Sequence, residues 1–313
     1  MPRVIDCPDN AIHDVAGCLD ALGDAGFDPA DEESLTRAAR ALRRLGNNRG
    51  FLGDLLVAQL KNRHAHIGES SAYGAQSIVL SRPRGGCFLR ANIWPSEHDS
   101  CFRSSGAKTF VYGMPHDHNF SFLTVGYLGP GYASDYYEYD YVTAVGYVGE
   151  RPGLRFVERS ALSEGKLMLY RANRDIHSQL PAESLSVSLN ILRIHPSEGW
   201  FDQYGFDLES GAITGILNPT ATETFLRCAV GLGGAEAIDL AAHFGRRHPS
   251  DRMRLASYEA RALLLDEGAA DTLWSEAERA GSILLAREAS RQRNQLQAGM
   301  HDLSAAKPEF HDG

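Results

Sequence analysis

The sequence has few of the features that mark a disulfide-stapled, membrane-spanning or nucleic-acid-binding protein. Its five cysteines are scattered and odd in number, and none forms a Cys-x-x-Cys pair, so we expect reduced thiols. No apolar run approaches the length of a membrane span. A formal net charge of -9 argues against a nucleic-acid or anionic-membrane partner, because both require a basic surface.

The N-terminus also lacks the long apolar core of a secretion signal, which favours a cytoplasmic protein. The remaining composition is that of an ordinary soluble globular chain, with 43% hydrophobic and 23% charged residues. A length of 313 residues provides for one large domain or two modest ones.

The first part of the chain has helical periodicity. Apolar residues recur on one face over 34–45 and again over 52–60, and the polar, glycine-containing stretch 46–50 separates the two. His64-Ala65-His66 follows, but residues two apart on a helix do not face each other, so we expect no metal there. We predict an N-terminal helical segment over residues 1–70.

From residue 77 the pattern changes to short strands separated by turns, which is typical of an all-β barrel. The expected strands are 77–80, 87–94, 120–128, 135–141, 142–148, 154–158, 166–171 and 185–192. Within 87–94, Arg90 and Asn92 share the face opposite Leu89 and Ile93. If that face looks into the barrel mouth, Arg90 can bind a substrate carboxylate; if it looks outward, Arg90 is an ordinary surface charge.

The composition changes again after Trp200. A hairpin is expected through Ser210-Gly211, and from Thr220 onward the pattern predicts amphipathic helices over 222–230, 235–244, 252–265 and 269–296. Their apolar stripes cannot be buried alone, so they should dock on the barrel or on a second subunit, as in a homodimer. We therefore predict a β-barrel over 71–200 and a loop with a C-terminal helical segment over 201–313.

Three histidines carry the strongest chemical signal. His116 and His118 flank Asp117, and on a strand two residues so spaced point to one face, roughly 6–7 Å apart. Their imidazoles can converge on one ion at about 2.0–2.1 Å, and the distant His177 would complete a triad. Three neutral imidazoles leave the ion its double positive charge and open coordination positions, whereas a structural zinc site would require a fourth protein ligand.

The order of these features resembles the cupin superfamily. Its first motif is a strand bearing His-x-His, and its second is a turn, a lone His and another strand; here the second reads Gly165 to Tyr170, then Asp175-Ile176-His177 and the 185–192 strand. The usual glutamate ligand after His-x-His is replaced by Phe122 and Leu123. The pattern is therefore more similar to the three-histidine, cysteine-dioxygenase-like branch. The resemblance implies a central cupin-like β-barrel, and with the flanking helices the fold class is mainly β (α+β).

The sequence departs from the thiol dioxygenases at their substrate motifs. Their early Tyr-x-Arg corresponds to Ala75-Gln76-Ser77, their Ser-x-His to Ser188-Leu189-Asn190, and the cysteine that some of them carry to Leu123. The resemblance thus implies the metal scaffold but not the thiol substrate. Together with Arg90 and Asn92, Asn190 is a candidate substrate-binding residue.

Glu138 is the acidic residue near the motif whose side chain we expect to point into the barrel. It can be a fourth ligand, an acceptor for a histidine N–H, a general base or a solvent-facing carboxylate. Tyr137 and Tyr139 are the tyrosines we consider for catalysis, and they face away from Glu138, so only one of the two sets can line the site. Asp117 points away from the histidine face and is interpreted as structural.

The expected function is a mononuclear non-haem iron oxygenase or dioxygenase acting on O₂ and a small polar substrate, such as an amino acid, a thiol or a derivative. Fe(II) is the expected ion, and Zn, Ni, Mn and Cu are alternatives, since neutral imidazole suits several transition metals. The alternative functions are a metal-dependent isomerase, lyase or hydrolase, and a non-catalytic metal-binding sensor or assembly protein.

Overall fold

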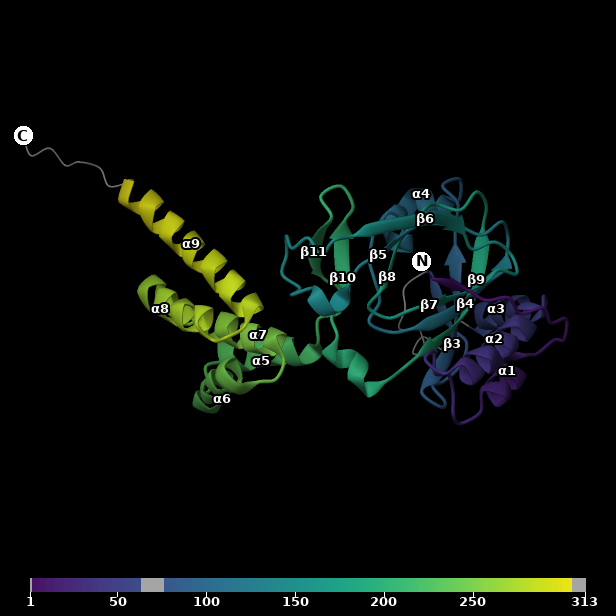
Figure 1. Cartoon of the computed structure of the whole chain (residues 1–313), viewed down its shortest axis with the longest axis horizontal. Coiled ribbons are helices and arrows are strands. Elements are labelled where there is room, and N and C mark those ends of the chain that lie inside the picture. The colour runs from purple at the N-terminus through teal and green to yellow at the C-terminus, as the bar shows by residue number, and fades with distance from the viewer. Residues whose placement is uncertain (1, 63–75, 306–313) are drawn as a thin grey trace, which may run out of the picture. The chain divides into compact units, whose positions relative to one another are not determined.

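Residues 2–62 and 76–305 are described by the computed structural model. Their contacts divide the chain into two units, one made of Met1–Ala144 and Arg151–Thr214 and the other of Val145–Glu150 and Gly215–Gly313 (Figure 1). The first unit contains the strands expected around the histidines, together with the N-terminal helices. The second His-x-His, at 64–66, lies outside the described residues.

A six-stranded antiparallel sheet is the largest element of the first unit. Its strand order is β1-β7-β4-β9-β3-β2, and the strands are β1 (Arg3–Val4), β2 (Ser77–Val79), β3 (Cys87–Trp94), β4 (Phe122–Leu128), β7 (Leu167–Tyr170) and β9 (Ser186–Arg193). The register of β3 with β9 places Arg90 opposite Asn190. Both side chains therefore project from the same face of this sheet.

Two smaller antiparallel sheets complete the first unit's β-structure. One has the order β6-β5-β8, with β5 (Ala133–Glu138), β6 (Arg155–Ala161) and β8 (Asp175–Gln179), and its register places Tyr136 opposite His177. The other pairs β10 (Tyr204–Asp207) with β11 (Ala212–Ile216), which confirms the expected hairpin.

The predicted closed barrel is wrong in form, because the strand ladders of the described residues do not close into one. The large and three-stranded sheets remain separate, and isolated bridges such as Tyr112↔Gln179 and His116↔His177 attach the chain before β4 to β8. That chain contains helix α4 (Ser100–Ser105), a 3₁₀ turn over Ala107–Phe110 and an extended segment rather than a further long strand.

The expected strand over 142–148 is also absent. Asp140 caps a short 3₁₀ turn at Tyr141–Thr143, and Gly146 and Gly149 follow with φ angles of 91° and 90°. Such positive φ angles are the left-handed region that glycine adopts without a steric cost. The valines and threonine here gave a strand-like pattern, but the glycines turn the chain.

The outer face of the large sheet is covered by N-terminal helices. The helical prediction is confirmed as α1 (Val15–Leu22), α2 (Glu32–Gly46) and α3 (Phe51–Asn62). The apolar face of α2 packs with strand residues in one buried core, which includes Leu35, Leu42, Leu89, Leu123 and Ile191. The described helices of this part of the chain are therefore packed on the large sheet through their apolar residues.

The other face of the large sheet forms a second, more aromatic core with residues of β5 and its neighbours. Its members include Trp94, Phe122, Tyr136, Met168 and Tyr170. Because successive strand residues alternate between faces, Leu89 joins the helical side while Arg90 projects toward this aromatic side.

The second unit is helical over its described C-terminal part, with α5 (Ala221–Gly231), α6 (Ala235–Arg247), α7 (Asp251–Ala262), α8 (Glu267–Glu278) and α9 (Ile283–Ala305). The helix expected over 269–296 is two helices, because Gly281 has a φ of 80° and the Ser282 hydroxyl accepts the Leu285 N–H at the start of α9. No helix among the described residues is both long and apolar enough to cross a membrane.

Candidate metal centre

The segment that carries His116 and His118 is extended but is not part of a regular strand. His116 forms an antiparallel bridge with His177: its N–H donates to the His177 carbonyl at 3.1 Å, and the His177 N–H donates back at 3.0 Å. The predicted strand is therefore corrected to an extended segment that precedes β4. Alternation still applies within it, so His116 and His118 point to one side.

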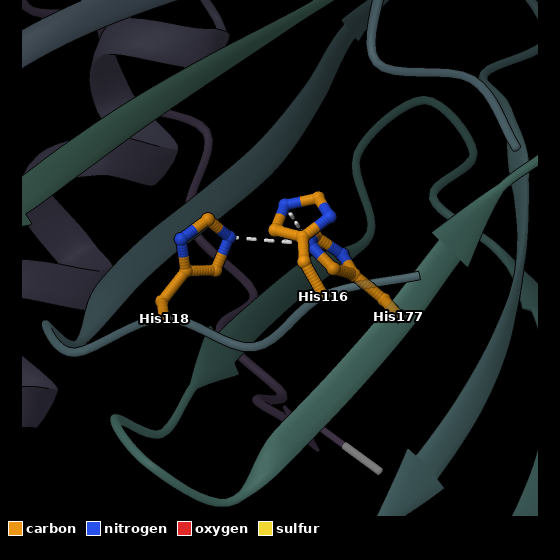
Figure 2. Close-up of side chains that lie close together, drawn as sticks. All are labelled: His116, His118 and His177. Carbon is orange, nitrogen blue, oxygen red and sulfur yellow. Dashed lines mark hydrogen bonds between the residues drawn. The ribbon is translucent and has the colours of Figure 1, made fainter. Parts of the chain in front are cut away.

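The three imidazoles converge through their Nε2 atoms (Figure 2). Nε2 of His177 lies 3.1 Å from Nε2 of His118 and 3.2 Å from Nε2 of His116, and one ligand atom from each ring lies within 4.8 Å of the others. Two nitrogens about 2.1 Å from a shared ion are roughly 3.0 Å apart at a right angle and roughly 3.4 Å apart at a tetrahedral angle. The two short separations therefore match adjacent ligands of one ion.

The tautomer of His116 is fixed by its backbone. Its Nδ1 lies 2.6 Å from the carbonyl oxygen of Met114, and because a carbonyl only accepts, Nδ1 must carry the proton. The lone pair is then on Nε2, which faces the other two rings. This single hydrogen bond sets both the orientation of the ring and its ability to bind a metal.

Burial keeps all three imidazoles neutral. It lowers the pKa of His116 and lowers the pKa of His118 and His177 well below the usual value, and the neighbouring histidines lower the pKa of His118 further. Neutral imidazole is the form that binds metal ions. The donor set therefore fits a transition-metal ion in its chemistry, and the two separations from His177 fit one in their spacing.

Asp117 points away from the imidazoles, as the alternation predicted. It is fully buried; one carboxylate oxygen accepts the hydroxyl of Tyr139 at 2.5 Å and the other accepts the Tyr204 N–H at 2.6 Å. Burial raises the pKa of Asp117 to about 6, although both hydrogen bonds oppose that rise. The carboxylate thus ties the histidine segment to β10 and to the residue that follows β5.

A cavity of about 290 Å³ opens beside the three histidines. The predicted substrate-binding residues Arg90, Asn92 and Asn190 all line it. Apart from the aliphatic Val111, the rest of its described lining is polar or aromatic: Gln76, Ser77, Trp94, Thr109, Phe122, Tyr132 and Gln179. None of the described residues that line it is acidic, so Arg90 is the fixed charge of this lining.

The candidate catalytic residues are placed elsewhere. Glu138 lies on the side of β5 that faces His177, but it is opposite Asp175, and its carboxylate is engaged by Arg171, Arg155 and Arg174 at 2.9, 2.9 and 3.4 Å. It is not among the residues that line the cavity. Its position gives no support to a role as ligand or base, and that role stays a prediction.

The two tyrosines are also away from the cavity lining. Tyr137 is half-buried and packs edge-on against Phe156, with ring centroids 5.3 Å apart. Tyr139 donates its hydroxyl to Asp117 on the far side of the histidine segment. Their catalytic roles remain predictions, while their observed contacts are structural.

Sequence reasoning missed several residues that line the cavity. Gln179 follows His177 by two positions on β8, so the alternation that linked His116 to His118 would have placed it on the same face. Tyr132 packs against Trp94 with the two rings tilted by 30° and their centroids 3.9 Å apart. No local signal identifies Tyr132, because it follows the turn glycines 129 and 131 and precedes β5.

Comparison with known proteins gives only remote similarities. No family model and no curated protein matches the sequence. Among solved structures, the chain is similar to a salicylate 1,2-dioxygenase from Pseudaminobacter salicylatoxidans, with a TM-score of 0.25 and 10% identity over 46% of this chain and 33% of that one. The chain therefore spans about a third of that dioxygenase chain.

Two further solved structures have comparable scores. The DMSP lyase DddQ from Ruegeria pomeroyi has a TM-score of 0.24 and 9% identity over 61% of this chain and 77% of that one. A prolyl 4-hydroxylase structure from Phytophthora capsici has a TM-score of 0.25 and 12% identity over 81% and 75%. Similarities at this level assign no family, and the function is argued from the site itself.

Proposed function

We propose that this protein is a metal-dependent enzyme, a mononuclear non-haem iron oxygenase of the cupin type that acts on a small carboxylate-bearing substrate. The observation that carries the proposal is the convergence of three neutral imidazoles, two buried and one half-buried, beside a cavity of substrate size. The residues that would hold the ion are His116, His118 and His177.

The charge of the site selects an anionic substrate. Three neutral ligands leave the double positive charge of a divalent ion uncompensated, and Arg90 adds a further positive charge to the same cavity. None of the described lining residues carries a carboxylate. An anion entering a low-dielectric cavity of this kind is attracted by both.

The polar residues that line the cavity have two roles: one binds the substrate and the others hold the cavity wall in place. A guanidinium can bind a carboxylate through two parallel hydrogen bonds, which is the role we assign to Arg90. Asn190 donates to the backbone carbonyl of Arg90 at 3.3 Å, and Asn92 accepts the Ser77 hydroxyl at 2.9 Å. These bonds hold the strand and one wall of the cavity in place while Trp94 and Phe122 exclude water.

The lining also favours oxygen chemistry over elimination or isomerisation by a protein base. Those reactions require a group that takes a proton from the substrate. Apart from the three histidines, the titratable side chains of the described lining are Arg90 and Tyr132. Burial raises the pKa of Tyr132 well above its usual value, so its hydroxyl stays protonated and is a poor base. Iron bound at the histidines would supply O₂ binding and oxidation next to the substrate, which requires no protein base.

Metal analysis of freshly purified protein tests the proposal first, followed by oxygen-consumption measurements with small carboxylic acids, amino acids and thiols. Bound iron with substrate-dependent O₂ uptake is the expected result. A redox-inactive ion with turnover that needs no O₂ would instead indicate an isomerase, lyase or hydrolase. Metal that no turnover depends on would indicate a sensor or assembly protein.

Substitution of each histidine tests the ligand set. His116→Ala, His118→Ala and His177→Ala should each lose most of the bound metal, because each removes one of three ligands. His64→Ala and His66→Ala serve as controls and should keep it. Full metal occupancy in the His177 variant would contradict the three-histidine assignment.

A further inference from the structure

Gln179 lies beside the three histidines, but the three-histidine assignment gives it no role. It is the last residue of β8, two positions after His177, and its side chain is 3% exposed. It lines the same cavity as the three histidines. A buried primary amide at this place should have its donors and acceptor satisfied, so its contacts are informative.

Three side-chain nitrogens crowd around one atom, Nε2 of His177. Those of His118 and His116 are 3.1 and 3.2 Å away, and the amide nitrogen of Gln179 is 3.4 Å away. A neutral imidazole nitrogen has either one hydrogen or one lone pair, so it makes one hydrogen bond. Three such neighbours are better explained as ligands around a shared ion.

The amide of Gln179 has an unused acceptor. Its Oε1 is buried and has no hydrogen-bond partner among the described residues. The oxygen and nitrogen of an amide are assigned from their hydrogen-bond network, and a half-turn of the amide exchanges them. The exchange would place a metal-ligating oxygen 3.4 Å from Nε2 of His177, where the nitrogen now lies. That separation, like the two between the imidazoles, lies in the range of roughly 3.0–3.4 Å expected for two adjacent ligands of one ion.

We propose that Gln179 supplies its amide oxygen as the fourth protein ligand of the ion held by His116, His118 and His177. The inference rests on the proposed metal site and adds a ligand to it. An amide oxygen is neutral, so the ion keeps its full charge and the cavity remains attractive to an anion. A glutamate at this position would lower that charge by one.

Metal affinity provides the first test, measured with Zn²⁺ against a competing chelator. Gln179→Ala should weaken Zn²⁺ binding by at least about 10-fold, a loss no smaller than that seen when a metal ligand loses its hydrogen-bond partner. Gln179→Glu is nearly isosteric and should bind Zn²⁺ more tightly than the wild type, because it adds a negative charge to the same ligand atom. Gln76→Ala is the control: Gln76 lines the same cavity, but its amide donates to the Phe110 carbonyl at 3.1 Å.

A spectroscopic count of ligands provides the second test and does not depend on turnover. With Cu²⁺ bound, pulsed electron paramagnetic resonance counts the coordinated imidazoles. The wild type should show three, and Gln179→His should show four, because a histidine at a ligand position replaces oxygen by nitrogen. Gln76→His should still show three.

The outcomes separate this inference from the proposed function. If His177→Ala loses the metal while Gln179→Glu binds no more tightly and Gln179→His shows three imidazoles, Gln179 is not a ligand and the three-histidine site stands. If the wild-type protein binds neither Zn²⁺ nor Cu²⁺ at these histidines, both the inference and the proposed function are overturned.

Discussion

Arg90 is the residue through which the cavity would recognise its substrate. Arg90→Met keeps much of the side chain's volume but removes the charge, and it should raise KM for a carboxylate substrate by roughly 10–100-fold, the value of a hydrogen bond to a charged group. Arg90→Lys should recover part of this loss, because it restores the charge without the planar fork. Steady-state kinetics on the substrate found by oxygen uptake provide the measurement.

The metal content of the Arg90 variants is the control. Both should bind as much iron as the wild type, because Arg90 is not a ligand. If KM is unchanged in Arg90→Met at full metal content, Arg90 does not bind the substrate carboxylate.

Substitution of Tyr139 distinguishes a structural role of its hydroxyl from a catalytic one. Its hydroxyl donates to the buried carboxylate of Asp117, which holds the segment between His116 and His118. Tyr139→Phe leaves that carboxylate short of a donor, so we expect a loss of about 1–3 kcal/mol in the free energy of unfolding, with little change in kcat per bound metal ion. Tyr137→Phe is the matched control, because no hydrogen bond of the Tyr137 hydroxyl contributes to this network.

Chemical denaturation and metal-normalised kinetics measure the two quantities for both variants. A large fall in kcat for Tyr139→Phe without loss of stability would restore the catalytic assignment that the sequence suggested.

At the scale of elements, β4 depends on a close approach of backbones. A Cβ added at Gly126 would lie 2.1 Å from the carbonyl oxygen of Ser163, and β4 has a register irregularity between Gly126 and Leu128. Gly126→Ala should therefore destabilise the first unit by about 1–3 kcal/mol or more, because the backbone itself must move. A thermal or denaturant unfolding curve provides the measurement.

Gly53 provides the control for that substitution. It lies inside α3, and nothing stands within 4 Å of a Cβ added there. Gly53→Ala should be neutral or stabilise by up to about 1 kcal/mol, because alanine has the higher helix propensity. Equal stability of the two variants would show that the contact at Gly126 carries no strain.

Local periodicity predicted those elements whose two faces meet different surroundings. In β3 the alternation of Leu89 with Arg90 was visible because Leu89 is buried against helices while Arg90 lines the cavity. The same alternation put His116 and His118 on one side and Asp117 on the other. A period of two specifies a face wherever the backbone is extended, even without a regular strand.

What the sequence could not predict depended on long-range partners. Glu138 lies on the same face of its sheet as His177, but the strand register places Glu138 opposite Asp175 rather than opposite His177. There its carboxylate forms an ion pair with Arg171. Closure of the sheets failed for the same reason, because strand pairing is decided by contacts far apart in the chain. Gly281 is a local signal for the break between α8 and α9, but the helical periodicity on both sides of this glycine obscured that signal.

At the scale of the whole molecule, every residue assigned to the metal site belongs to the first unit. The residues that hold the histidine segment, Asp117, Tyr139 and Tyr204, also belong to the first unit. The bridge between His116 and Gly205 lies in the same unit. The helices α5 to α9 contribute none of these described contacts. The site should therefore not require them.

Two shortened chains test this reasoning. A chain ending at Pro219, before α5, keeps β10 and β11, so it should bind metal with the affinity of the full chain. A chain ending at Trp200 loses the Tyr204 N–H bond to Asp117 and the Gly205 bridge to His116, and its affinity should fall by roughly 10–100-fold, as when the support of a ligand is removed. Metal titration of both chains beside the full-length protein provides the measurement. Equal affinity in all three would show that β10 does not support the histidine segment, and loss of metal from the longer one would show that the helices contribute to the site.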